Sequence, residues 1–442
     1  MLSNRRLRRR LKPRIEGLES RQLLESSGLG DALTGGREVA FLPEVPRHDA
    51  LIHATEARVR HGVDGSGLTA AIIDTGVDFD HPSLSIGGGW RVGIDFVGHG
   101  FEVIPDAEAL RHGTAVAGLL AAADPNRPGV APGANLIGLR VFDHQGQGDF
   151  DAIGNALQWV IDHHETFHVT VVNVSIVDGR NYRPTQLPSG EAVDRIGALV
   201  RQLRDLRIPV VAASGNRFDG RQGMGFLAIL EETVSVTATD VADRPLSSAQ
   251  RLGQAVGGPL ATDLAAPGSG LLAPAGAFGH SAVEGTSFAA PLVSGAILLL
   301  QELYKSRFGI LPPVDELVGW LRDGAEPVPD PATGIFLNRL NIARSALLLP
   351  DPFLVAEPPP AITLPALPTP KRVITPPVLG SRLQARAAAL RALRGPAPVA
   401  RNLPTRPALP FSQDRPAPIP VSPVARWQAL RATRPRPISP GA

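Results

Sequence analysis

Short apolar runs alternate with longer amphipathic segments through the middle of this 442-residue chain. The run Leu68 to Ile73 is almost continuously apolar and leads directly into Asp74, a pattern typical of a buried strand that ends in a loop. Four further runs of this kind are predicted strands, at 135–141, 169–175, 209–213 and 233–238. Helix-length segments separate them, notably 150–163 and 193–206. This alternation predicts an α/β fold, a doubly wound and mostly parallel sheet with helices on both faces.

The longest apolar run, Ala289 to Leu300, follows the small-residue stretch Gly-Thr-Ser at 285–287. It is shorter than the roughly 18–20 residues that a membrane span needs, so we interpret it as a buried helix with no membrane span in the chain. A helix that begins behind Ser287 places free N–H groups and the positive end of a dipole beside that serine. Such a place suits a nucleophile, although the same pattern also describes an ordinary helix cap.

Composition narrows the chemistry. The chain is 43% hydrophobic, which suits a globular protein with a sizeable core, and it contains no cysteine, which excludes disulfides, a thiol nucleophile and thiolate metal ligands. Charge is strongly segregated. Residues 1–27 carry 8 basic and 3 acidic side chains and residues 351–442 carry 13 and 3, which leaves 23 basic and 36 acidic side chains between them. The middle of the chain is therefore acidic and both ends are basic.

The composition shifts predict four segments. Residues 1–27 form a basic, targeting-like segment, residues 28–50 a linker rich in glycine and proline, and residues 51–348 the folded domain. Residues 349–442 form a Pro/Arg-rich tail, because 21 of the 43 prolines lie in 351–442 and such a sequence buries too little apolar surface to offset its ordering entropy. Within that tail only 381–394 has a composition that favours a short helix.

The N-terminal segment lacks the apolar stretch of an ordinary secretory signal. Its run Leu18 to Leu24, behind a polybasic start, resembles the LEPR-XLL-type motif found on many large exported bacterial proteins, with Ser20 where that motif has proline. The alternative is a leucine-rich segment without an addressing role.

Four polar residues lie where such a sheet places its functional groups, beyond the carboxyl ends of the strands. Asp74 ends the first long strand, His112 opens a segment of small residues, Asn216 follows the strand 209–213, and Ser287 precedes the long apolar helix. A serine hydroxyl becomes a nucleophile when an imidazole takes its proton and a carboxylate orients that imidazole. A side-chain amide can donate to the oxyanion that develops. Each residue alone also fits a cap, a turn or a structural histidine, so the joint order Asp, His, Asn, Ser carries the argument.

The runs 74–78 (Asp-Thr-Gly-Val-Asp), 112–118 (His-Gly-Thr-Ala-Val-Ala-Gly) and 285–291 (Gly-Thr-Ser-Phe-Ala-Ala-Pro) resemble the three active-site signatures of the subtilases, the S8 family of subtilisin-like serine peptidases. Two shorter runs, 130–132 and 265–268, resemble the family's linking motifs. The resemblance covers roughly residues 51–348. It implies a subtilisin-like fold and a serine endopeptidase with an Asp74–His112–Ser287 triad, in the order known from subtilisin. It also implies an oxyanion hole formed by Asn216 and the Ser287 backbone N–H.

The resemblance further implies where substrate binds. Gly146 and Gly148 in one segment, and Ser175, Ile176 and Val177 in another, match segments that pair with an extended peptide by strand addition. The strand end with Ala213 and Gly215 completes the binding residues.

Two positions depart from the family pattern. Val177 replaces a glycine of the family, so we expect a preference for small or medium apolar P1 side chains. Leu227 stands where many relatives have proline, which leaves the shape of that loop open.

Two accessory features of the family, an inhibitory propeptide and a calcium site, have little support in the sequence. No inhibitory propeptide domain is recognisable in residues 1–50. No cofactor is expected, and calcium has no assignable site because the loop 121–129 offers only Asp124 and Asn126 as side-chain oxygen ligands.

We expect polypeptide substrates, a monomer, no specific nucleic-acid partner, and a place outside the cell or in its envelope, with the cytoplasm as the alternative. Two other functions stay open: a catalytically silent binding scaffold, and an anionic-surface or nucleic-acid binder that uses the basic ends.

Overall fold

The computed structural model describes residues 14–15, 47–85, 88–97, 111–143, 146–276 and 278–352. The predictions for the leucine-rich motif at 18–24 and for the tail, including its short helix at 381–394, lie outside the described residues. The boundaries of the four predicted segments stay predictions.

A nine-stranded sheet runs through the described part of the chain in the order β12-β13-β9-β8-β7-β6-β2-β4-β3. All neighbouring pairs except β12–β13 are parallel. A separate hairpin joins β10 to β11. The strands of the large sheet and the hairpin are β2 (Thr69–Asp74), β3 (Arg91–Asp95), β4 (Asn135–Arg140), β6 (Val169–Val174), β7 (Val210–Ala213), β8 (Val234–Thr239), β9 (Leu264–Pro267), β10 (Ser269–Ala275), β11 (Gly279–Glu284), β12 (Glu326–Asp330) and β13 (Ile335–Arg339).

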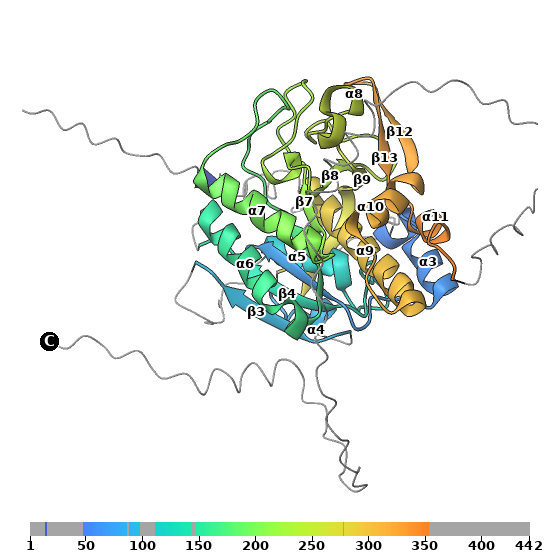
Figure 1. Cartoon of the computed structure of the whole chain (residues 1–442). Coiled ribbons are helices and arrows are strands. Elements are labelled where there is room, and N and C mark those ends of the chain that lie inside the picture. The colour runs from blue at the N-terminus through green and yellow to red at the C-terminus, as the bar shows by residue number, and fades with distance from the viewer. Residues whose placement is uncertain are drawn as a thin grey trace, which may run out of the picture. The chain divides into compact units, whose positions relative to one another are not determined.

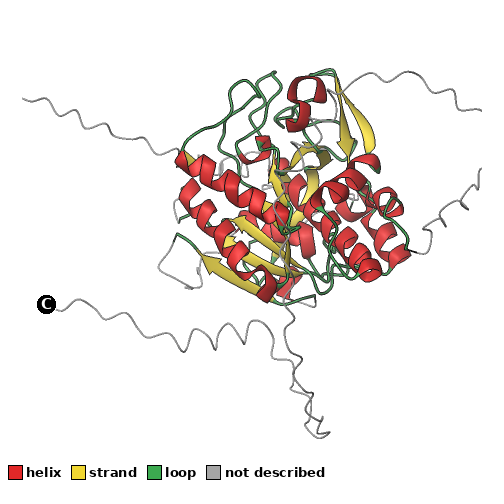
Figure 2. Cartoon of the chain, viewed as in Figure 1, coloured by secondary structure: helices red, strands yellow, loops and turns green. Residues whose placement is uncertain are grey.

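Helices cover both faces of this sheet (Figure 1). One face is covered by α6 and α7, which contact β2, β6 and β7, and the other by α5 and α9, which contact the strands from β4 to β9. Figure 2 shows the strands between these helical layers. The predicted doubly wound, mostly parallel α/β fold is therefore confirmed. The helices are α2 (His48–Leu51), α3 (Ala54–His61), α4 (Pro82–Ser85), α5 (Arg111–Ala121), α6 (Phe150–Phe167), α7 (Glu191–Asp205), α8 (Gln254–Gly257), α9 (Thr286–Phe308), α10 (Val314–Asp323) and α11 (Ile342–Leu347), with 3-10 turns at η1 (Leu227–Ile229) and η2 (Gly258–Leu260).

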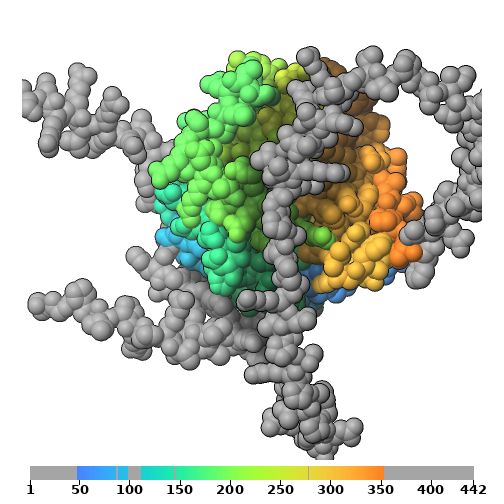
Figure 3. All heavy atoms as spheres, viewed as in Figure 1, coloured from blue at the N-terminus to red at the C-terminus, as the bar shows by residue number. Residues whose placement is uncertain are grey.

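The central strands are the parts that the apolar pattern predicted best. Strand β6 reads Val-Thr-Val-Val-Asn-Val and is buried at every position, because helices cover it on both sides. Helix α7, by contrast, has exposed polar positions such as Glu191 and Arg201, and Figure 3 shows green atoms from this part of the chain on the visible surface. The antiparallel pairs β10–β11 and β12–β13 carry no comparable apolar run, and the sequence analysis did not predict them.

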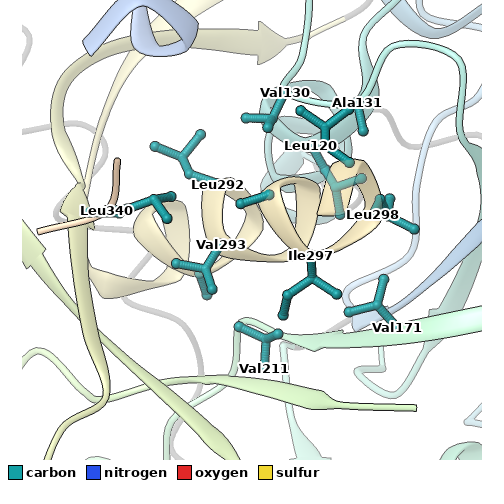
Figure 4. Close-up of a cluster of buried hydrophobic side chains, with 14 of the residues drawn as sticks. Leu120, Val130, Ala131, Val171, Val211, Leu292, Val293, Ile297, Leu298 and Leu340 are labelled. Atoms are coloured by element: carbon teal, nitrogen blue, oxygen red, sulfur yellow. The ribbon is translucent and has the colours of Figure 1, made fainter. Parts of the chain in front are cut away.

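Helix α9 forms the centre of the core. Its side chains contact α5 and the strands β6 to β9, and Figure 4 shows Leu292, Val293 and Ile297 packed among residues of several elements. By length and composition α9 could cross a membrane, with a mean hydropathy of 1.4 over its most apolar window. However, 94% of that window is buried inside the protein, as expected of a core helix.

A buried charge cluster fixes the first described helices against α5. Asp49 is fully buried and accepts hydrogen bonds from Arg47, Thr55 and Arg58, while Arg58 also donates to the backbone carbonyls of 129 and 130. His48 lies beside Asp49 and bonds the backbone of Leu119 on α5. Its burial lowers the pKa to about 4; Asp49 opposes this shift, and the two arginines add to it.

We expect His48 to make folding sensitive to mild acid. Because the folded pKa lies below the ordinary value of 6.5, the unfolded chain binds more protons than the folded protein between pH 6.5 and about 4. Stability should therefore fall as the pH drops through this window, by roughly 3 kcal/mol in total at about 1.4 kcal/mol per pKa unit. Urea unfolding of wild type and His48→Gln at pH 7.5 and pH 4.5 measures this. A difference between the two pH values that is equal in both proteins would contradict it.

Candidate active site

Asp74 lies where the order of the sheet reverses. From β2 the chain goes outward to β3 and β4 and then crosses to β6 on the other side, so the carboxyl end of β2 is a topological switch point. Asp74 is the last residue of β2 and is completely buried. Its Oδ1 accepts the backbone N–H of Thr75 at 2.7 Å. This carboxylate is thus fixed at the edge where parallel sheets place their sites.

His112 approaches Asp74 from the first turn of α5. Its Nδ1 lies 2.8 Å from Asp74 Oδ1, and because the carboxylate accepts, Nδ1 carries the proton and Nε2 is the basic nitrogen. The contact depends on Gly113, where a Cβ would lie 2.0 Å from the carbonyl oxygen of Gly76. Any larger residue there would push α5 away from the β2 loop. The small residues of this segment therefore serve close packing of the histidine against the aspartate.

Ser287 stands in the first turn of α9, buried to 3% exposure. The preceding Gly285 has a φ of 135°, a conformation that residues with a side chain rarely adopt, and a Cβ there would lie 3.1 Å from Asn216 Nδ2. The ring of Phe288, the next residue, lies 5.1 Å from the ring of His112. Packing of α5 on α9 thus brings the histidine and the serine-bearing helix end together.

Asn216 is oriented by the same helix end. Its Oδ1 accepts the backbone N–H of Thr286 at 2.9 Å and lies 3.0 Å from the hydroxyl of Thr286. A backbone N–H can only donate, so the oxygen of the amide must face Thr286 and the NH₂ group must point away from it. Thr286 also accepts the N–H of Gly215 at 3.1 Å. The sequence analysis did not single out Thr286, whose only signal is its place beside the serine.

The predicted substrate segments meet this helix end. Ser175, which follows β6, is fully buried and its hydroxyl donates to the backbone carbonyl of Ser287 at 2.7 Å. Ala213 ends the neighbouring strand β7, and Gly215 comes two residues later with a φ of 113°. The structure therefore brings residues 175, 213–216 and 285–287 together.

A small, mostly apolar pocket lies farther along the segment that begins at Ser175. It is lined by Phe150, Ile153, Ile176, Val177, Asp178, Phe226 and Leu227. The carboxylate of Asp178 accepts the backbone N–H groups of Arg180 and Phe226, and burial together with Asp178 raises the pKa of Tyr182 to about 12. Leu227, whose loop shape the sequence left open, begins the turn η1 and is buried in the pocket wall.

The other predicted segment borders the same pocket. Gly146 closes a tight turn with a φ of 69°, and Gly148 and Asp149 form the short strand β5, directly before Phe150. Strand β5 pairs antiparallel with β1 (Arg14–Ile15), with Ile15 opposite Gly148. The sequence analysis missed Phe150, Ile153 and Phe226 as pocket residues; the signal available was an aromatic residue directly after Gly-Gln-Gly-Asp.

No metal centre is visible in the described ranges, where no group of three or more histidine, aspartate or glutamate side chains could hold an ion. Asp124 Oδ1 accepts the backbone N–H of Asn126 at 2.9 Å, so this loop uses that carboxylate for its own turn. The expectation that no calcium site can be assigned stays a prediction.

The chain belongs to the subtilase family, whose model matches residues 65–326. Its enzyme class is therefore that of a serine-type endopeptidase. Among solved structures, the prenylagaramide maturation protease PagA has a TM-score of 0.52 at 22% identity, covering 66% of this chain and 97% of that one. At that identity the likeness supports the shared fold alone.

The names of the similar proteins differ in whether they give an intracellular location. The chain is 31% identical over 272 residues to an intracellular serine protease of Paenibacillus polymyxa, covering 60% of this chain and 75% of the relative. It is 33% identical over 248 residues to subtilisin NAT of Bacillus subtilis subsp. natto, covering 54% of this chain and 56% of that protein. The major intracellular serine protease of Bacillus subtilis is 30% identical over 280 residues, with 61% and 79% covered. Two of these three relatives are named as intracellular and the third, a subtilisin, is not. An intracellular and an external location are therefore both compatible with the relatives.

Proposed function

We propose that this chain hydrolyses peptide bonds with Ser287 as nucleophile, His112 as general base and Asp74 as the group that orients the histidine. The observation that carries this assignment is the 2.8 Å contact between His112 Nδ1 and the buried Asp74, because it directs the basic Nε2 away from the carboxylate. A catalytically silent scaffold has no need of this arrangement. Labelling with a fluorescent fluorophosphonate tests the proposal: wild type should be labelled and Ser287→Ala should not, whereas an unlabelled folded wild type would favour the scaffold.

The chemistry follows from these placements. His112 Nε2 takes the hydroxyl proton as Ser287 Oγ attacks the scissile carbonyl, and Asp74 stabilises the resulting imidazolium. The protonated histidine then gives its proton to the leaving amine, which leaves an acyl-enzyme on Ser287. Water, deprotonated by His112, attacks the ester and restores the serine. The backbone N–H of Ser287, in the first turn of α9, would donate to the developing negative charge, whereas the N–H of Thr286 is already bonded to Asn216.

Asn216 would supply the side-chain donor to the oxyanion. Because Thr286 holds its Oδ1, the NH₂ group is presented in a fixed direction before substrate binds. Asn216→Ala should lower kcat by about 10²–10³-fold with little change in KM, since the donor acts mainly in the transition state. Steady-state kinetics on a peptide substrate measures this, with Asn155→Ala as the control, an exposed amide on α6 that accepts from Arg195 on α7. A loss confined to KM would argue against an oxyanion role.

Val177 would restrict the P1 side chain. A Cβ at Gly225 would lie 3.8 Å from the Cβ of Val177, so the valine faces the loop before Phe226 across a narrow gap. We expect wild type to prefer small or medium apolar P1 residues, and Val177→Gly to raise kcat/KM for P1 Phe relative to P1 Ala by about tenfold, near the value of one or two methylene groups in a pocket. Hydrolysis of a P1-varied peptide library measures the ratio. An unchanged ratio would contradict the assignment.

We further propose polypeptides as the substrates and a monomer as the working form. Location inside or outside the cell is left open by the relatives' names.

A further inference from the structure

Pro291 leaves one backbone carbonyl at the start of α9 without its helical partner. In an α-helix the N–H of each residue donates to the carbonyl four residues earlier, and proline has no N–H. Pro291 lies inside α9, so the carbonyl that loses its donor is that of Ser287, the proposed nucleophile. Both residues are buried, and a buried carbonyl without a partner is costly.

Ser175 supplies the missing donor from the sheet. Its hydroxyl lies 2.7 Å from the carbonyl oxygen of Ser287, and the side chain is completely buried directly after β6. This hydroxyl also accepts the Nδ2 amide of Asn173 at 2.9 Å, which leaves its single hydrogen for the carbonyl.

The chain of hydrogen bonds returns to the same helix. Asn173 Oδ1 accepts the hydroxyl of Ser294 at 2.9 Å, and Ser294 lies seven residues after Ser287 on α9. The three side chains, Asn173, Ser175 and Ser294, are all completely buried. The first two turns of α9 are therefore hydrogen-bonded at their start to Ser175 and at their end to Asn173. Each hydrogen bond in such a buried chain strengthens its neighbours.

We infer that Asn173, Ser175 and Ser294 are positioning residues for the nucleophile. They fix the first turn of α9 relative to the segment 175–177, so that the Ser287 hydroxyl keeps its place against a peptide bound along that segment. This inference rests on the proposed function, since it takes Ser287 as the nucleophile and 175–177 as a peptide-binding segment. It predicts an effect on the chemical step, because a misplacement of about 1 Å can cost about 10²-fold in rate.

The test is a double-mutant cycle between Ser175 and Pro291 in the full chain. Ser175→Ala removes the donor and should lower kcat on succinyl-Ala-Ala-Pro-Leu-p-nitroanilide by about 10- to 100-fold with KM within about threefold. Pro291→Ala restores an N–H that can bond the Ser287 carbonyl within the helix. In the double variant, kcat should be at least about tenfold higher than in Ser175→Ala. The ratio of kcat between Pro291→Ala and wild type gives the effect of the same substitution when Ser175 is present.

Two further measurements separate the possible failures. Fluorophosphonate labelling of wild type reports the proposed nucleophile by itself. If wild type is labelled but Ser175→Ala keeps its kcat, or Pro291→Ala recovers nothing, the positioning role is wrong while the proposed function stands. Absence of labelling would remove both. Should Ser175→Ala fail to fold, Ser175→Cys keeps the shape with a weaker donor and should show an intermediate loss of kcat that Pro291→Ala again reduces.

Discussion

Ser287→Ala should abolish measurable peptide hydrolysis, with kcat lowered by about 10⁴-fold or more. The alanine removes the oxygen that forms the acyl-enzyme. The two hydroxyls that bond this helix end cannot replace it, because Ser175 is bonded to the backbone of 287 and Thr286 to Gly215 and Asn216. Residual hydrolysis would come from transition-state binding alone. Peptide cleavage measured at equal concentrations of folded protein gives the ratio.

The matched control for this substitution is Ser306→Ala on the same helix. Ser306 donates to the carbonyl of Leu303 near the other end of α9, far along the helix from the first turn. It should keep kcat close to the wild-type value. Equal losses in both variants would mean that the effect comes from damage to α9 and would sink the assignment of Ser287 as nucleophile.

The central sheet could be predicted from the sequence because its strands are buried on both faces. At β2 and β6 the apolar pattern reflects burial at every position, so the predicted and observed ranges differ by a residue or less at each end. The hairpin β10–β11 has several exposed or half-buried positions, and its pairing is set by register between residues such as Leu271 and Val283. Local pattern does not carry that information.

Candidate site residues were predictable where the chemistry requires a particular side chain beside a structural break. Asp74 and Asn216 follow buried strands and Ser287 opens a helix, so each could be found in the sequence without knowing its partners. Residues that only orient the others could not. Thr286 bonds Asn216, 70 residues away in the chain, and Ser175 bonds the carbonyl of Ser287, 112 residues away, so the roles proposed for these residues depend on distances that no local pattern contains. The role proposed for Pro291 likewise could not be predicted, because it depends on Ser175 lying opposite the carbonyl that Pro291 leaves without a donor from the helix.

Asp74→Asn tests whether Asp74 orients His112, because it replaces the carboxylate by an amide of the same size and leaves no empty space. An amide at this position can place its NH₂ against His112 Nδ1, which then holds no proton, so the proton moves to Nε2 and the histidine cannot accept from Ser287. We expect kcat to fall by about 10⁴-fold near neutral pH with KM little changed, because substrate binding does not involve Asp74. Asparagine has the same shape, so the fold should survive. The NH₂ group that faces His112 then gives up the N–H of Thr75, because the same carboxylate oxygen holds both contacts in wild type.

Asp78→Asn provides the comparison within the same loop. The carboxylate of Asp78 accepts the N–H of Asp80 and its own backbone N–H donates to Thr114, so it neighbours the site without touching His112. This variant should retain kcat within a few-fold of wild type, because the histidine keeps its proton on Nδ1. Single-turnover cleavage of a peptide by the two variants decides the matter. Comparable rates for Asp74→Asn and wild type would show that the 2.8 Å contact is structural and that His112 is oriented by some other group.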